Sequence, residues 1–117
     1  NIKNFLNING KILIAVPNVD SIESKIFKTD WVAYDAPRHL YHFNIESMKT
    51  LLDNHDICIE KKIPVFQDTL FNIISSIKSE NLLVKIFKFI FLTIYSLFII
   101  KINSKYSSSN IYICSIK

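Results

Sequence analysis

Residues 11–17 read Lys-Ile-Leu-Ile-Ala-Val-Pro, and this stretch decides the fold class. Five consecutive apolar residues without polar alternation are typical of a strand buried on both faces, as in a parallel sheet covered by helices. Asn9-Gly10 supplies a turn before the strand, and Pro17 ends it because proline has no N–H to donate. We therefore expect an α/β architecture around this strand.

Apolar periodicity predicts the elements that follow. A helix is expected over residues 45–54, with Asn44 as its N-cap, and a strand over 57–63 closed by Pro64. A second helix is expected over 69–79, and an all-round apolar helix over 82–102. Residues 107–110 read as a loop and residues 111–116 as a final strand. The expected apolar stripes are Met48, Leu51 and Leu52 on the first helix and Leu70, Ile73, Ile74 and Ile77 on the second.

Composition excludes several classes of protein. A chain of 117 residues is one domain at most, and its single glycine, Gly10, leaves no dinucleotide fingerprint, phosphate loop or nucleophile elbow. Cys58 and Cys114 are too few for a four-cysteine zinc site or a disulfide scaffold, and free thiols suit a reducing compartment. The sequence carries no complete cofactor-binding or catalytic module.

The net charge of +4 does not indicate a nucleic-acid partner. Thirteen of the fourteen basic residues are lysines scattered along the chain, and the only arginine is Arg38. Bidentate recognition of phosphate or guanine depends on arginine, so we expect no nucleic acid among the partners.

The most informative segment is residues 27–43, Phe-Lys-Thr-Asp-Trp-Val-Ala-Tyr-Asp-Ala-Pro-Arg-His-Leu-Tyr-His-Phe. It brings a tryptophan, an acid, the only arginine and two of the three histidines together directly after a buried strand. Ligands of open α/β sheets bind beyond the carboxyl ends of the strands, so a site is expected here.

The order Val-Pro-Asn (16–18), Phe27, Trp31 and Asp35-x-Pro-Arg-His-Leu-x-His-Phe43 resembles the C-terminal half of a class I S-adenosylmethionine-dependent methyltransferase. The match is to the subgroup with a W-x-x-x-D-x-P-R-H-L-x-H-F signature. It covers residues 1–63 and the last strand, whereas residues 66–105 match only as a helical insert. Two positions depart from the family pattern, because Lys28 and Asp56 stand where glycine is usual.

The resemblance implies a Rossmann-like seven-stranded sheet whose last strand is antiparallel. Residues 11–17, 57–63 and 111–117 would be its last three strands. Residues 1–65 would form the C-terminal sheet half with an acceptor-side loop, residues 66–106 a hydrophobic helical insert, and residues 107–117 the final strand. The missing N-terminal half would bind the cofactor, S-adenosylmethionine, upstream of Asn1. A chain that begins without methionine is accordingly expected to be part of a longer protein.

The same resemblance suggests roles for individual residues. His39 would be the general base or would orient the acceptor, with His42 second, because histidine titrates near neutral pH and Arg38 disfavours a second positive charge. In the alternative, both histidines bond the backbone and shape the loop. The expected substrate-binding residues are Asn18, Trp31, Asp35 and Arg38. Asp35 and Arg38 could instead pair with each other, and Trp31 could pack the loop onto the sheet. Two histidines three residues apart lack further ligands, so no metal is expected.

Residues 82–102 would span about 31 Å as a helix, enough for a bilayer, but their uncharged core from Phe89 to Ile100 reaches only about 18 Å. This helix could be covered by the fold, a partner, a lipid-like acceptor or a membrane.

We therefore expect a methyltransferase fragment acting on a small-molecule, sugar or lipid-linked acceptor, in the cytoplasm or at its membrane face. The alternative is a small membrane-associated, non-enzymatic protein anchored by residues 82–102.

Overall fold

A computed structural model describes residues 2–117, and Asn1 lies outside the described residues. The elements, in chain order, are η1 (Ile2–Phe5), β1 (Ile12–Pro17), α1 (Ile22–Phe27), η2 (Lys28–Asp30), η3 (Val32–Tyr34), α2 (Ile45–Asp53), β2 (Ile57–Pro64), α3 (Phe66–Ser76), α4 (Leu82–Ile102), η4 (Ser104–Tyr106) and β3 (Ser109–Ile116). The α/β class expected from the sequence is confirmed.

The last strand lies in the middle of the sheet. The strand order is β1-β3-β2, and β3 is antiparallel to both neighbours, with Tyr112 opposite Ile14 on one side and Cys114 opposite Ile59 on the other. β1 and β2 therefore run in the same direction, although they do not touch. The three expected strands are adjacent, and the last one has the expected direction.

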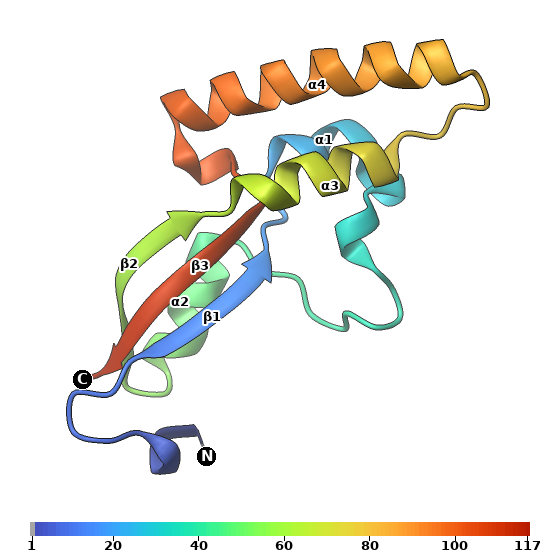
Figure 1. Cartoon of the computed structure of the whole chain (residues 1–117). Coiled ribbons are helices and arrows are strands. Elements are labelled where there is room, and N and C mark those ends of the chain that lie inside the picture. The colour runs from blue at the N-terminus through green and yellow to red at the C-terminus, as the bar shows by residue number, and fades with distance from the viewer. Residues whose placement is uncertain (1) are drawn as a thin grey trace.

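Helix α2 covers one face of this sheet (Figure 1). Its buried residues Met48 and Leu52 pack with Ile12, Ile57 and Tyr112 into the apolar core. Asn44 caps the helix as expected, since its side chain accepts from the Ser47 N–H at 2.8 Å. Leu51, expected on the buried stripe, is exposed instead.

The expectation that residues 11–17 are buried on both faces is wrong for this chain. Burial alternates along β1, and Leu13 is 68% exposed while its neighbour Ile12 is buried. The reason is that β1 pairs with an antiparallel strand on one side only and has a helix on one face only.

A second layer of helices lies beyond the carboxyl ends of β1 and β2. α1 and α3 are next to the sheet and α4 is outermost (Figure 1). α4 has the expected bounds and is the one helix of residues 2–117 that is long and apolar enough to cross a membrane; its most apolar window has a mean hydropathy of 2.1 and is 11% buried. Length and composition alone give weak support for a membrane span.

Helix α3 differs from its sequence-based description. It begins at Phe66 and ends at Ser76, and Leu70 and Ile74 of the expected stripe are exposed. Ile73 and Ile77 of that stripe are buried as expected, and the other buried side chains of α3 are polar: Thr69, Asn72 and Ser76. The apolar period located the helix, but the polar groups of the neighbouring segments decided which face turned inward.

Lys28 and Asp56, the two positions at which the resemblance leads one to expect glycine, both have positive φ. Asp56 has φ 53°, and Lys28, the C-cap of α1, has φ 51° with ψ −124°. Aspartate tolerates positive φ better than most residues, whereas the conformation of Lys28 is one that glycine adopts without a steric penalty. Lys28 therefore strains the turn after α1.

Replacing Lys28 with glycine is expected to stabilise the protein. Removing the Cβ relieves strain of about 1 kcal/mol or more, which exceeds the added entropy of the unfolded chain. The midpoint of urea unfolding in a non-ionic detergent should rise for Lys28→Gly. Lys49→Gly, inside α2, is the matched control and should lower it by about 1 kcal/mol. A lower midpoint for Lys28→Gly would show that the turn is not strained.

Helix α1 buries an acidic side chain. Glu23 is fully buried, and neither carboxylate oxygen makes a well-formed hydrogen bond within the described residues. Burial raises the pKa of the Glu23 carboxyl, and the nearby hydroxyls of Ser21 and Ser96 offset this only in part. Glu23 therefore favours the protonated form in the folded state.

A raised folded-state pKa makes the contribution of Glu23 less favourable as pH rises. Below the ordinary value of 4.5 the carboxyl is protonated in both states; above it, only the unfolded chain ionises freely, so stability falls. Glu23→Gln should therefore match the native protein near pH 4 and exceed its stability at pH 7, measured by urea unfolding. Glu80→Gln, on an exposed side chain, should change neither value. Equal stabilities of Glu23→Gln and native protein at pH 7 would contradict a burial penalty.

Candidate functional site

The segment from Trp31 to Phe43, the signature segment, folds over the carboxyl end of β1 and is held at both ends. At its start the Val32 N–H donates to the Ser76 hydroxyl on α3 at 2.9 Å. At its end Phe43 forms a bridge with Asn18, and its carbonyl accepts from the Val19 N–H at 3.0 Å. The segment between is thereby placed beside Pro17, the last residue of the strand.

An aromatic series fixes the interior of this loop. Trp31 is 1% exposed and meets the Tyr34 ring edge-to-face at a centroid distance of 5.1 Å, and Tyr34 meets the His42 ring in the same way at 5.0 Å. The adjoining η3 turn contacts α3 rather than the sheet. Trp31, expected to bind substrate or to pack the loop, is thus buried and presents no free ring face.

Both histidines make hydrogen bonds to backbone carbonyls. His39 Nδ1 lies 3.2 Å from the Ala33 oxygen, and His42 Nε2 lies 2.9 Å from the Tyr34 oxygen. A carbonyl oxygen can only accept, so each of these ring nitrogens must carry the hydrogen. In the neutral ring the other nitrogen then holds a lone pair, which is Nε2 for His39 and Nδ1 for His42. Both histidines therefore make the backbone contacts expected if they only shape the loop. Each ring also keeps one nitrogen that can act as a base.

Asp35 and Arg38 pair with each other. Asp35 Oδ1 accepts from Arg38 Nη2 at 2.6 Å and from Nε at 3.0 Å. The Arg38 side chain is 81% exposed, so the pair is worth at most about 1 kcal/mol. Its effect is local, because it closes the turn in which the His39 N–H donates to the Asp35 carbonyl.

His39 lies between two cavities at the carboxyl end of β1. The larger has a volume of about 270 Å³, and its polar lining includes Asp35, Arg38, His39, Asp68 and Asn72. The smaller has a volume of about 110 Å³ and is lined by Tyr41, His42 and Phe43 together with residues of β1. Pro17 and His39 line both. The larger cavity therefore offers carboxylates, an amide and an imidazole to one ligand.

The sequence analysis missed Asp68 and Asn72 as cavity residues. Both lie on α3, which the sequence suggested was only a variable insert. Asn72 is buried, and its amide donates to the Ser108 hydroxyl at 2.6 Å, which ties α3 to the start of β3. Polar residues three or four apart on α3 were the available signal, but the apolar stripe beside them dominated the helical pattern.

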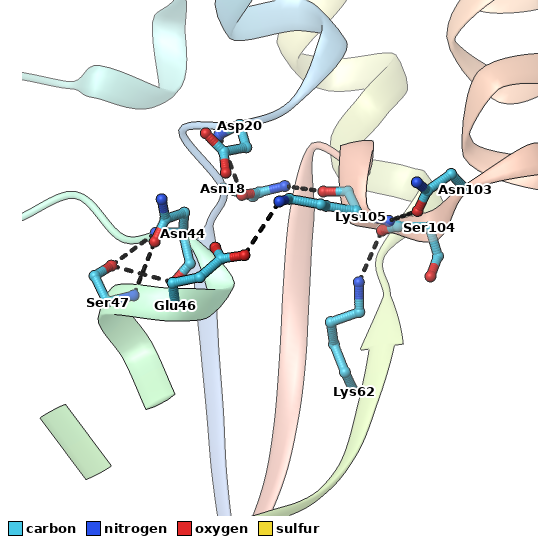
Figure 2. A network of polar contacts seen from close by, with 9 residues as sticks. All are labelled: Asn18, Asp20, Asn44, Glu46, Ser47, Lys62, Asn103, Ser104 and Lys105. Carbon is cyan, nitrogen blue, oxygen red and sulfur yellow. Dashed lines mark hydrogen bonds and ion pairs between the residues drawn. The ribbon is translucent and has the colours of Figure 1, made fainter. Parts of the chain in front are cut away.

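Asn18 is only 3% exposed and acts as a connector (Figure 2). Its amide nitrogen donates to the carbonyls of Lys105 and Ser107, at 2.8 Å each, and its oxygen accepts from the Asp20 N–H at 3.2 Å. These three hydrogen bonds of the Asn18 side-chain amide are all made within the protein. The structure places this expected substrate-binding residue in the scaffold that joins β1 to the segment before β3.

Charged side chains surround this connector (Figure 2). Lys105 pairs with Glu46 of α2 at 3.1 Å, and this hydrogen bond lowers the pKa of the Glu46 carboxyl. Lys62 of β2 donates to the Ser104 carbonyl at 2.9 Å. η4 is therefore joined to β1, α2 and β2 by polar contacts.

The one glycine of the chain lies in the turn before β1. A Cβ added at Gly10 would lie 2.9 Å from the Asn7 carbonyl oxygen, so this glycine serves to close its own turn. Within residues 2–117, no three His, Cys, Asp or Glu side chains are placed to hold a metal ion.

Comparison with known proteins does not identify a relative. The sequence matches no protein-family model and no curated protein, and no solved structure matches the chain.

Removal of the Asn18 amide tests its place in the scaffold. Asn18→Ala leaves the carbonyls of Lys105 and Ser107 without a donor and is expected to cost about 2 kcal/mol or more in the free energy of unfolding. Urea unfolding of this variant should be compared with that of Asn54→Ala, an exposed residue after α2, which should change little. An unchanged stability for Asn18→Ala would free this residue for a role in binding.

Proposed function

We propose that this chain is the acceptor-side part of an S-adenosylmethionine-dependent methyltransferase. The observation that carries the proposal is the position of His39. It lies at the carboxyl end of β1, between two cavities, with Nδ1 held by a backbone carbonyl and Nε2 left as a base. That is the arrangement needed to take a proton from a hydroxyl or amine.

The sheet supports the same proposal. The resemblance implies three final strands of which the last is antiparallel, and β1, β2 and β3 meet that requirement. The outer edge of β1 has no partner strand within the described residues, and Leu13 leaves an apolar side chain exposed on the uncovered face. Both features suit a sheet that continues with further strands next to β1.

The larger cavity favours a hydroxylated acceptor. Asp68 and the second oxygen of Asp35 can accept hydrogen bonds from hydroxyl groups, and the exposed face of His39 can take up the proton that is lost. Sugars and lipid-linked sugars carry such groups. S-adenosylmethionine would supply the methyl group, and the resemblance implies that the residues that bind it lie upstream of Asn1.

The second candidate is a membrane-associated protein without enzymatic activity. The observation in its favour is α4, which is long, apolar and largely exposed. The two candidates differ in what precedes Asn1: a strand and a glycine-rich loop about a hundred residues upstream would support the enzyme. A start codon at or near Asn1 would support either a truncated remnant of such an enzyme or the second candidate.

Replacement of His39 tests the proposal in the longer protein that the proposal requires. His39→Ala should lower turnover by about 10² to 10⁴-fold because proton removal is lost, and His39→Gln, which can keep the Ala33 contact, should lose as much. His55→Ala, in the turn after α2, is the matched control and should leave turnover unchanged. Near-normal turnover of His39→Gln would show that the ring only shapes the loop.

In calorimetry, residues 1–117 alone should not bind S-adenosylmethionine at micromolar concentration.

A further inference from the structure

The outer layer of helices buries several polar side chains and exposes most of its apolar ones, although Ile73 and Ile100 are also buried. Ser96 of α4 is fully buried and Thr93 Oγ1 is inaccessible, on the side of α4 that faces α1 and Glu23. Helix α3 repeats the pattern, with Thr69, Asn72 and Ser76 buried. The reverse arrangement is usual for a helix on the surface of a water-soluble protein.

The outward face of α4 is entirely apolar along most of its length. Its most exposed apolar side chains include Leu83, Phe87, Phe91, Ile94 and Phe98, which are between 59% and 77% exposed. The rings of Phe87 and Phe91 stack on each other, with a centroid distance of 6.5 Å. A continuous apolar face of this length requires a cover.

The charges around this face indicate what covers it. α4 contains no acidic residue, while Lys85 and Lys88 lie in its first half and Lys101 in its last turn. Lysines at the borders of an apolar face suit a bilayer with anionic headgroups, where the aliphatic stems lie along the apolar region and the ammonium groups reach the phosphates. A second copy of this chain would bring lysines against lysines.

Sheet topology decides how α4 would meet that bilayer. Lys78, just before α4, pairs with Asp30 at 2.6 Å, and Lys105, just after it, pairs with Glu46. β3 then lies between β1 and β2, so the segments before and after α4 belong to one body. A single crossing would place those segments on opposite sides of the membrane. α3 has 11 residues, too few to return across it.

We propose that α4 lies in the plane of an anionic membrane surface, with Phe87, Phe91 and Phe98 inserted and the sheet held on the aqueous side. Figure 1 shows α4 as the outermost element, its axis running across the top of the molecule and the sheet below the other helices. The proposal does not depend on methyl transfer. With α4 bound to the membrane, the sheet and the cavities beside His39 would stay close to the membrane surface.

Sedimentation with vesicles tests the binding. The full chain should bind phosphatidylcholine vesicles and should bind about tenfold more tightly when a fraction of the lipid is phosphatidylserine, with high salt removing the difference. Phe87→Glu with Phe91→Glu should weaken binding about a hundredfold or more. Ile8→Glu, at an apolar residue that is 95% exposed and lies between η1 and β1, is the control and should not weaken binding.

Circular dichroism of the double variant checks that it folds, and Phe87→Ala with Phe91→Ala, expected to lose at least about tenfold, replaces it if it does not. Absence of vesicle binding by the native chain would overturn the proposal, as would a stable dimer in sedimentation velocity that binds no vesicles. Equal binding of the native chain and a folded Phe87/Phe91 variant would also overturn it.

Depth measurements separate an in-plane helix from a crossing one. Nitroxide labels on Leu83→Cys and Phe91→Cys, in a chain with Cys58→Ser and Cys114→Ala, should report the same shallow depth. A helix along the bilayer normal would separate the two labels by about 12 Å in depth, and that result would overturn the in-plane orientation.

Discussion

The position of β3 between β1 and β2 is the constraint on which the rest of the structure depends. The chain leaves the sheet after β2, forms α3 and α4, and must return to fill the central position with the opposite direction. This return requires α4 to begin and end on the same body. It also brings Ser107 and Ser109 to the carboxyl end of β1, where the signature loop lies.

Polar contacts, more than apolar packing, hold the helical layer to that sheet. The connector Asn18, the pair of Asn72 and Ser108 and the bond from Val32 to Ser76 each join segments distant in sequence. Apolar packing is concentrated on the other side, between α2 and the sheet. Because hydrogen bonds are directional, they fix the orientation of the loop over residues 31–43. Most of the apolar side chains of α3 and α4 then face outward.

The buried Glu23 marks the cost of this arrangement. A carboxyl group is desolvated beneath α4, close to Ser96, and burial raises its pKa. Burying a carboxylate costs free energy, so the charged form of Glu23 does not stabilise the fold. Glu23 lies beneath α4, the most apolar helix of the chain, so polar groups gather on the inner side of this helical layer. The same inward placement of polar groups accounts for the contacts that hold the loop and for the apolar outer face of α4.

The sequence by itself determined the local elements: Asn44 capped a helix, residues 82–102 formed one uninterrupted helix, and three apolar stretches formed strands, because short-range periodicity and capping act within a few residues. It also indicated that residues 31–43 lie beyond β1. Only the tertiary structure decided that Leu13 is exposed, that α3 buries its polar side and that Asn18 and Trp31 are enclosed. Those outcomes depend on which segment covers which face, and that is set by contacts such as Asn72 with Ser108, between residues far apart in the chain.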